Sequence, residues 1–143
     1  MSDKKHIIEE IRAFNRYYTG LIGLLDDHLL NSNYSLVEAR ILYEIQAHQP
    51  VSASRITSEA DIDKGYLSRV LKRFEKEKLI TKHISSEDAR VSLLSLSRKG
   101  SQLFDELNDA SNRQVASLID GLPKAKQQKL VGHMNAIKAM LAQ

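Results

Sequence analysis

Residues 62–76 read IDKGYLSRVLKRFEK, and this stretch, with the segment that follows it to residue 100, decides the fold. Its apolar residues recur at the three- and four-residue spacing of one helix face. They are Leu67, Val70, Leu71 and Phe74. The opposite face carries Gly65, Arg69, Lys72 and Lys76. Asp63 is the expected N-cap, because a carboxylate there can accept a backbone N–H of the first turn. The sequence therefore predicts a helix that is apolar on one side and basic on the other.

Such a helix has two interpretations, and its neighbours decide between them. A charged face is common on solvated surface helices. A basic face also suits a helix that enters the major groove of DNA beside a flanking wing. Residues 79–97 predict a β-hairpin, because apolar and polar residues alternate on both sides of the polar segment SSEDAR at residues 85–90. A hairpin at this position favours the DNA-binding interpretation.

An earlier helix is predicted from residue 36 to about residue 48. Ser35 and Glu38 have the spacing of a capping box, and the preceding segment NSNYS at residues 31–35 predicts a turn. Pro50 ends the helix, since the residue before a proline disfavours helical backbone. The expected buried surface comprises Leu36, Val37, Ala39, Ile41, Leu42, Tyr43 and Ile45.

A short helix is predicted between these two, with Ser52 as its N-cap and its end near Ala60. Residues 60–62 then turn the chain into the basic helix. Two short helices joined by a tight turn, of which the second is amphipathic and basic, predict a helix-turn-helix. Ser52, Ser54 and Arg55 could also hold a phosphate at the helix N-terminus, and this role is compatible with capping.

Long helices are predicted at both ends of the chain. Residues 4–29 carry apolar side chains at helical spacing, namely Ile7, Ile11, Phe14, Tyr18, Leu21, Ile22 and Leu25. Ser97 caps another helix that runs to about Asp120 and stops at Gly121. Pro123 is expected at the first position of a last helix, whose stripe comprises Leu130, Met134, Ile137 and Leu141. Because these stripes exceed what a small winged domain covers, we expect them to pair with each other and with a second subunit.

The composition restricts the class of protein. The chain has 143 residues, of which 42% are hydrophobic, as in a globular domain with a core, and it contains no cysteine. It has no apolar run of membrane-spanning length and no signal-peptide pattern, so we expect no membrane partner and a cytoplasmic location. Residues 62–100 carry ten Lys and Arg against five Asp and Glu, whereas the rest carries eleven against thirteen. The basic excess is concentrated on one segment, as in nucleic-acid-binding surfaces.

The chain resembles the MarR (multiple antibiotic resistance regulator) family over about residues 7–140. The hairpin carries the most specific signature: Asp88-Ala89-Arg90, then LSLS at residues 94–97 and Gly100, which resembles the family's Asp-x-Arg tip followed by Leu-Thr-x-x-Gly. Ser97 replaces the usual Thr, and Lys78 replaces a common Gly. Residues 14–18, 38–43 and 65–75 look closest to the regulator halves of proteins fused to GNAT acetyltransferases.

The resemblance implies a homodimeric regulator, expected to be a repressor, that binds a pseudo-palindrome in double-stranded DNA. A small, often aromatic, effector would release the DNA. On the basic helix, Lys64, Tyr66 and Ser68 come first and are the candidates for base edges, with Gly65 among them. Arg69 could read guanine or grip phosphate, and Lys72 and Arg73 are expected on phosphates. At the hairpin tip, Arg90 suits a narrow minor groove, and Asp88 could hold its guanidinium or serve as a plain turn residue.

The expected fold class is mainly α with a small β-wing: a winged helix-turn-helix flanked by long N- and C-terminal dimerisation helices. Residues 1–143 form a single MarR-type domain, with a DNA-binding lobe at 31–100 and a helical dimerisation lobe at 1–30 and 101–143. We expect no enzyme, cofactor or metal site, because the sequence lacks a nucleotide loop, a catalytic set and tight histidine spacing. The alternatives are the regulatory half of an acetyltransferase-linked protein and a helical interaction module without DNA binding.

Overall fold

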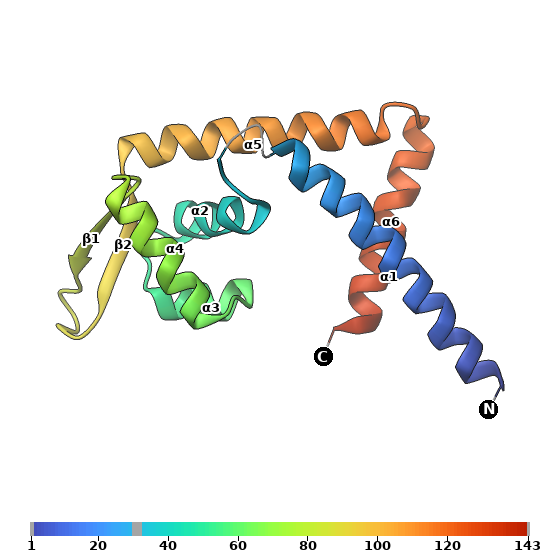
Figure 1. The fold of residues 1–143 in the computed structure, drawn as a ribbon, viewed down its shortest axis with the longest axis horizontal. Coiled ribbons are helices and arrows are strands. Elements are labelled where there is room, and N and C mark those ends of the chain that lie inside the picture. The colour runs from blue at the N-terminus through green and yellow to red at the C-terminus, as the bar shows by residue number, and fades with distance from the viewer. Residues whose placement is uncertain (1, 30–32, 143) are drawn as a thin grey trace. The chain divides into compact units, whose positions relative to one another are not determined.

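The computed structural model describes the backbone of residues 2–29 and 33–142, and confirms the mainly helical class with a two-stranded wing (Figure 1). The elements are α1 (Ser2–Leu29), α2 (Leu36–His48), α3 (Ala53–Ala60), α4 (Lys64–Lys76), β1 (Ile80–Ile84), β2 (Ser92–Leu96), α5 (Arg98–Ile119) and α6 (Lys124–Leu141). The chain divides into two compact units, residues 1–108 and residues 109–143. Part of the turn predicted at residues 31–35 lies outside the described residues. None of the described helices is long and apolar enough to cross a membrane.

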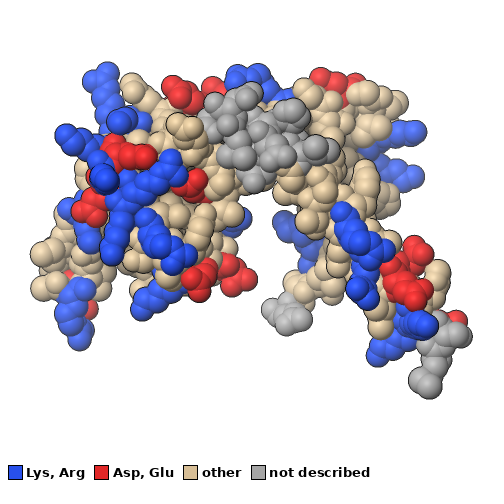
Figure 2. Space-filling view, in the orientation of Figure 1, with Lys and Arg blue, Asp and Glu red and all other residues tan. Residues whose placement is uncertain are grey.

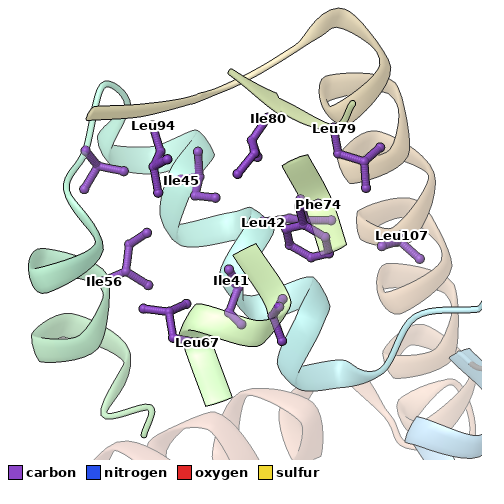
Figure 3. Packing of buried hydrophobic residues seen from close by; sticks show 12 residues of the cluster. Ile41, Leu42, Ile45, Ile56, Leu67, Phe74, Leu79, Ile80, Leu94 and Leu107 are labelled. Carbon is purple, nitrogen blue, oxygen red and sulfur yellow. The ribbon is translucent and has the colours of Figure 1, made fainter. Parts of the chain in front are cut away.

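The core of the first unit lies where α2, α3, α4 and the hairpin meet (Figure 3). Its fully buried large side chains include Ile41, Leu42 and Ile45 of α2 and Phe74 of α4. The predicted apolar face of α4 is confirmed, with Leu67, Val70 and Phe74 buried and Leu71 half-buried. The expected burial of two α2 residues is wrong: Val37 is 43% exposed and Tyr43 is 50% exposed. Helical twist turns Tyr43 away from Ile41 and Ile45. Val37 lies one turn before Ile41 on the same side, but in the first turn of α2, where it lines an open hollow.

Caps predicted from sequence define the starts of the inner helices. Ser35 and Glu38 form the capping box of α2, with mutual bonds of 3.1 and 2.9 Å. Ser52 Oγ accepts the Arg55 N–H at the start of α3. Asp63 accepts the Tyr66 N–H at 2.9 Å at the start of α4. Between α3 and α4, Asp61 takes the left-handed conformation, with φ of 51°, which gives the tight turn of the helix-turn-helix.

The residue after the C-cap of α4 is Lys78, where the family resembled often has glycine. Lys78 has φ of 62°, in the region that glycine adopts at lower cost. The Leu79 N–H donates to the Phe74 carbonyl at 2.8 Å, and the Lys78 N–H donates to the Glu75 carbonyl at 3.1 Å. These two bonds are those of a Schellman motif, so a lysine occupies the usual glycine position. The wing therefore begins at a fixed angle to α4.

The hairpin is antiparallel, with Ile80 opposite Leu96 and Ile84 opposite Ser92. Val51 extends it from the segment between α2 and α3, through two backbone bonds with Leu94 of 3.0 and 2.7 Å. Leu94 and Ile80 are buried, whereas Ile84 is 68% exposed. The inner half of the wing is thus part of the core, and its outer half stands in solvent.

A junction at Leu79 joins the end of α4, the wing and α5. The Leu79 carbonyl accepts the Ser97 N–H at 2.9 Å, and Ser97 Oγ donates to the Lys78 carbonyl at 2.6 Å. Ser97 Oγ also accepts the Gly100 N–H at 3.0 Å, which confirms it as the cap of α5. The Gly100 backbone lies so close that an added Cβ would be 1.9 Å from the Leu79 carbonyl oxygen. Only glycine fits this first turn of α5.

The second unit contains the C-terminal half of α5 and the whole of α6. Pro123 is the N-cap of α6, not its first helical residue as the sequence suggested, because its ψ of 151° is extended. Gln127 Nε2 donates to the carbonyls of Ile119 and Leu122, which satisfies the turn between the helices. Helix α6 exposes Val131, Met134, Ile137, Met140 and Leu141. In the first unit, α1 exposes Ile7, Ile8, Ile11, Phe14 and Tyr17.

We expect Gly100→Ala to lower the free energy of unfolding by at least about 2 kcal/mol, because the Leu79 backbone must move to admit a methyl group. The matched control is Gly132→Ala on α6, where an added Cβ meets nothing within 4 Å. That exchange should raise the free energy of unfolding by about 0.5–1 kcal/mol. Urea unfolding of both variants measures the difference. A Gly100→Ala protein as stable as the wild type would contradict the close approach at Leu79.

Candidate nucleic-acid interface

A groove with a volume of about 570 Å³ lies between the start of α3, the outer face of α4 and the wing. It brings together six of the residues predicted from sequence: Ser52, Ser54, Lys64, Ser68, Lys72 and Arg90. They come from three separate segments of the chain. On the face shown in Figure 2, Lys and Arg side chains gather over α4. The groove also contains one acid, Glu75, and apolar side chains at its floor, so it is a concave surface with a net basic lining.

Sequence reasoning missed one basic residue of this groove. Lys82 of β1 lines it, opposite the α4 residues Lys64 and Lys72. The sequence shows that Lys82 alternates with Ile80 and Ile84 in the predicted strand. In the structure, Ile80 is buried at the base of the wing. The twist and reach of the hairpin, which bring Lys82 beside α4, are not encoded in that pattern.

The outer face of α4 presents further predicted residues. Gly65 leaves room for the cap, since an added Cβ would lie 3.2 Å from Asp63 Oδ2. The Arg69 guanidinium carbon lies 5.9 Å from the Tyr66 ring centroid, within the range of a cation–π contact. This contact restrains a long side chain on an exposed face, so Arg69 is partly ordered before any partner arrives.

At the start of α3, the predicted phosphate-binding set is only partly assembled. Ser52 caps the helix, and Ser54 is exposed in the groove. Arg55 instead donates from Nη2 to His48 Nδ1, at 3.2 Å, and does not line the groove. The Arg55 guanidinium is therefore engaged by α2.

The wing tip holds the predicted pair of Asp88 and Arg90. Asp88 Oδ1 accepts the Arg90 backbone N–H at 3.0 Å and Nε at 3.1 Å, and Oδ2 accepts Nη2 at 3.2 Å. Bonding to the Arg90 side chain, and then to its backbone, lowers the pKa of Asp88. The Arg90 side chain is 90% exposed. The pair thus orders an arginine in open solvent at the rim of the groove.

Arg73 requires a correction to the list of phosphate contacts, because its guanidinium is engaged within the protein. It forms an ion pair with Glu38, donates from Nε to Glu77 at 3.0 Å and from Nη2 to the Asn33 carbonyl at 3.1 Å. Its guanidinium carbon lies 4.7 Å from the Tyr34 ring centroid. Arg73 does not line the groove. We therefore remove it from the proposed DNA contacts.

Sequence reasoning missed these Arg73 contacts because most of the partners are distant in the chain. Glu38 and Asn33 lie 35 and 40 residues away. Only Glu77, four residues on at the C-cap of α4, gave a local signal.

Metal ligation has no support in the described part of the chain, where no three His, Asp or Glu side chains cluster suitably.

The two short helices, the wing and the basic groove define a winged helix-turn-helix protein. Several known proteins are similar to it. The model of the MarR family matches residues 34–92. The HTH-type transcriptional regulator MgrA of Staphylococcus aureus is 28% identical over 125 residues, which are 82% of this chain and 80% of MgrA. The structure of Staphylococcus aureus MarR in complex with salicylate and kanamycin is 27% identical, with a TM-score of 0.75 over 93% of this chain and 90% of that one.

A further solved structure, Streptococcus pneumoniae FabT in complex with DNA, shares the fold. It is 20% identical, with a TM-score of 0.77 over 92% of this chain and 96% of that one. These likenesses show the winged-helix fold, and the match to the MarR family model covers residues 34–92 of the 143.

The Tyr34–Glu77 contact predicts an acid sensitivity. The Tyr34 hydroxyl donates to Glu77 at 2.7 Å, and this bond is the main reason that the pKa of Glu77 is lowered. A lowered pKa stabilises the fold above the ordinary carboxyl pKa of about 4.3, and that stabilisation is lost as the pH falls through the folded-state value. We expect Tyr34→Phe to cost about 1 kcal/mol at neutral pH and less at about pH 3.

Urea unfolding at both pH values tests this expectation, with Tyr43→Phe on α2, a residue that is 50% exposed, as the matched control. A Tyr34→Phe penalty that is the same at neutral and acidic pH would exclude the bond to an ionised Glu77 as its cause.

Proposed function

We propose that this chain represses transcription by binding a pseudo-palindromic operator in double-stranded DNA as a homodimer. One observation carries the proposal: the groove gathers Ser52, Ser54, Lys64, Ser68, Lys72 and Arg90 from three segments onto one basic surface. Positive side chains around a concave face suit the phosphate walls of a DNA groove.

Within the proposed interface, α4 enters the major groove by its N-terminal end. Lys64, Tyr66 and Ser68 then face base edges, where Gly65 permits close approach. Arg69, held against Tyr66, reads guanine or binds a phosphate. The remaining phosphate contacts are assigned to Lys72 and Lys82, with Ser52 and Ser54 at the start of α3 and Arg55 at its edge. Arg90 enters the adjacent minor groove, oriented by Asp88.

Homodimer formation accounts for the apolar faces that a single chain leaves exposed. Ile11 and Tyr17 of α1 are 55% and 67% exposed, and Met140 and Leu141 of α6 are 81% and 73% exposed. Helices of this kind gain stability by packing against another apolar face. We therefore assign residues 1–30 and 101–143 to dimerisation and residues 31–100 to DNA binding. A two-fold axis would place the two α4 helices about one DNA turn, roughly 34 Å, apart.

A second hollow, of about 460 Å³, supports release by a small molecule. It lies beside the start of α4, lined by apolar side chains of α2 and of the α3–α4 turn, including Leu36, Val37 and Ile62. Tyr66 also lines it, so an occupant would touch a proposed base-reading residue. The salicylate in the staphylococcal MarR complex makes a small aromatic acid the first effector to test.

The regulator is favoured over the two alternatives. The relatives match as regulators across most of both chains, which gives no support to an acetyltransferase-linked protein. A helical module without DNA binding would not need basic side chains gathered around the groove. We propose no enzymatic activity and no cofactor.

Selection from random duplex DNA tests the proposed function. The wild-type protein should enrich a two-fold-related sequence whose half-sites are spaced by about one helical turn. Transcription from a promoter that carries this sequence should fall when the protein is present. Failure to enrich any duplex would exclude sequence-specific binding.

Arg90→Ala should weaken binding to the selected duplex by about 1–3 kcal/mol, because the wing would no longer reach the minor groove with a guanidinium. The fold should stay unchanged, since the side chain is 90% exposed. Glu87→Ala in the same turn is the matched control. Titration at fixed salt measures both variants, and an affinity equal to that of the wild type would mean that the wing does not engage DNA.

Lys72 and Ser68 should respond differently to substitution, because they are assigned to phosphate and to bases. Lys72→Ala should weaken binding to selected and scrambled duplexes by similar factors. It should also reduce the slope of log affinity against log salt by about one unit for each phosphate that a subunit no longer neutralises. Ser68→Ala should relax base preference at one position of each half-site and leave the slope nearly unchanged. A Lys72→Ala protein without discrimination between the duplexes but with an unaltered slope would reverse the assignment.

A further inference from the structure

We infer that Arg73 is a positioning residue, which fixes the orientation of α4 against the start of α2 so that the base-reading end of α4 meets DNA in a single register. The inference rests on the proposed function, since it concerns how α4 is presented to DNA. It assigns Arg73 a role in discrimination without any contact to the nucleic acid.

The contacts of Arg73 link three parts of the protein. Two partners are carboxylates: Glu38 in the first turn of α2 and Glu77 at the end of α4. The others belong to the segment before α2, namely the Asn33 carbonyl and the Tyr34 ring. Tyr34 in turn donates its hydroxyl to Glu77. The guanidinium therefore joins the end of α4 to the beginning of α2 through both charge and stacking.

Glu38 gives this link its rigidity. It is only 7% exposed. Its Oε1 accepts the Ser35 N–H at 2.9 Å in the capping box, while its Oε2 pairs with Arg73. One carboxylate thus serves the α2 cap and the α4 contact together. Because the cap fixes the Glu38 side chain, the position of Arg73 is fixed as well.

The apolar contacts between these helices do not define orientation in the same way. Ile41, Leu42 and Phe74 are fully buried, but hydrophobic burial is non-directional. A guanidinium that donates from several nitrogens accepts only a narrow range of geometries. A buried ion pair adds little net stability over an apolar replacement, so its contribution here is directional.

The two neighbouring residues Lys72 and Arg73 point in different directions, so Arg73 contacts the rest of the protein and Lys72 lines the groove. Successive helix residues are turned by about 100°. Lys72 is exposed and lines the groove, whereas Arg73 is half-buried and does not. Tilting of α4 would displace Lys64 and Ser68, at its groove-lining N-terminal end, relative to the bases. The contact at Arg73 restrains that tilt from the other end of the helix.

The test compares two variants with wild-type protein. Arg73→Met combined with Glu38→Gln removes both charges, so no unpaired carboxylate stays buried. Arg73→Lys keeps the charge and removes the planar fork. Lys72→Met is the matched control for a phosphate contact. The probes are the duplex that wild-type protein selects from random DNA and a scrambled duplex of equal length, each titrated over a range of salt, with the folded fraction measured by circular dichroism.

We expect the double variant, at equal folded concentration, to bind the selected duplex about ten-fold or more weakly, while its affinity for the scrambled duplex changes little. Its salt slope should equal that of wild type. Arg73→Lys should be folded and should also discriminate less well than wild type, by a smaller factor. Lys72→Met should weaken binding to both duplexes and reduce the slope.

Three results would overturn the inference. A reduced salt slope in the double variant, with a normal slope restored in Arg73→Lys, would make Arg73 a phosphate contact. Normal discrimination by both Arg73 variants would make its role purely structural, and the Arg73→Lys protein decides this point if the double variant does not fold. If wild-type protein selects no duplex, the proposed function itself fails, and the inference fails with it.

Discussion

The burial of one face of α4 is the constraint on which the rest of the structure depends. Phe74 is fully buried and Leu67 is 1% exposed, so the rotation of the helix about its own axis is fixed. Every other residue of α4 then has its direction set by helical geometry. Lys72 points into the groove, and Arg73 points toward α2. The division between residues that line the groove and residues that contact the rest of the protein follows from this burial.

Much of this arrangement could be predicted from local sequence. Ser35, Ser52, Asp63 and Ser97 act within three residues of themselves, so their caps were evident, and the alternation on either side of the wing tip gave the hairpin. The internal role of Arg73 was not predictable, because its partners come from distant segments. The exposure of part of α2 also escaped prediction, since periodicity marks an apolar stripe but not how wide a neighbouring surface covers it.

Two of the paired arginines in the first unit, Arg73 and Arg90, differ in what surrounds them. Arg90 and Asp88 form their pair in solvent, where such contacts contribute little to stability. A phosphate can therefore replace Asp88 at little cost. The Arg73 side chain is 37% exposed, and that of Glu38 is 10% exposed. Removing one partner there leaves a poorly solvated charge, so this pair is maintained. Similar chemistry thus gives an adaptable contact in one place and a fixed one in the other.

The junction at Leu79 has a consequence for how such proteins diversify. Because the Ser97 N–H bonds to the Leu79 carbonyl, the two ends of the hairpin are held together, and only its outer turn projects beyond the core. Lengthening its outer turn would cost only loop entropy, about 0.6 kcal/mol for each doubling of length. In the proposed DNA complex, insertion or deletion there would change the span of DNA that the tip reaches while the helices stay in place. Target preference at the flanks of a site would then evolve separately from recognition at its centre.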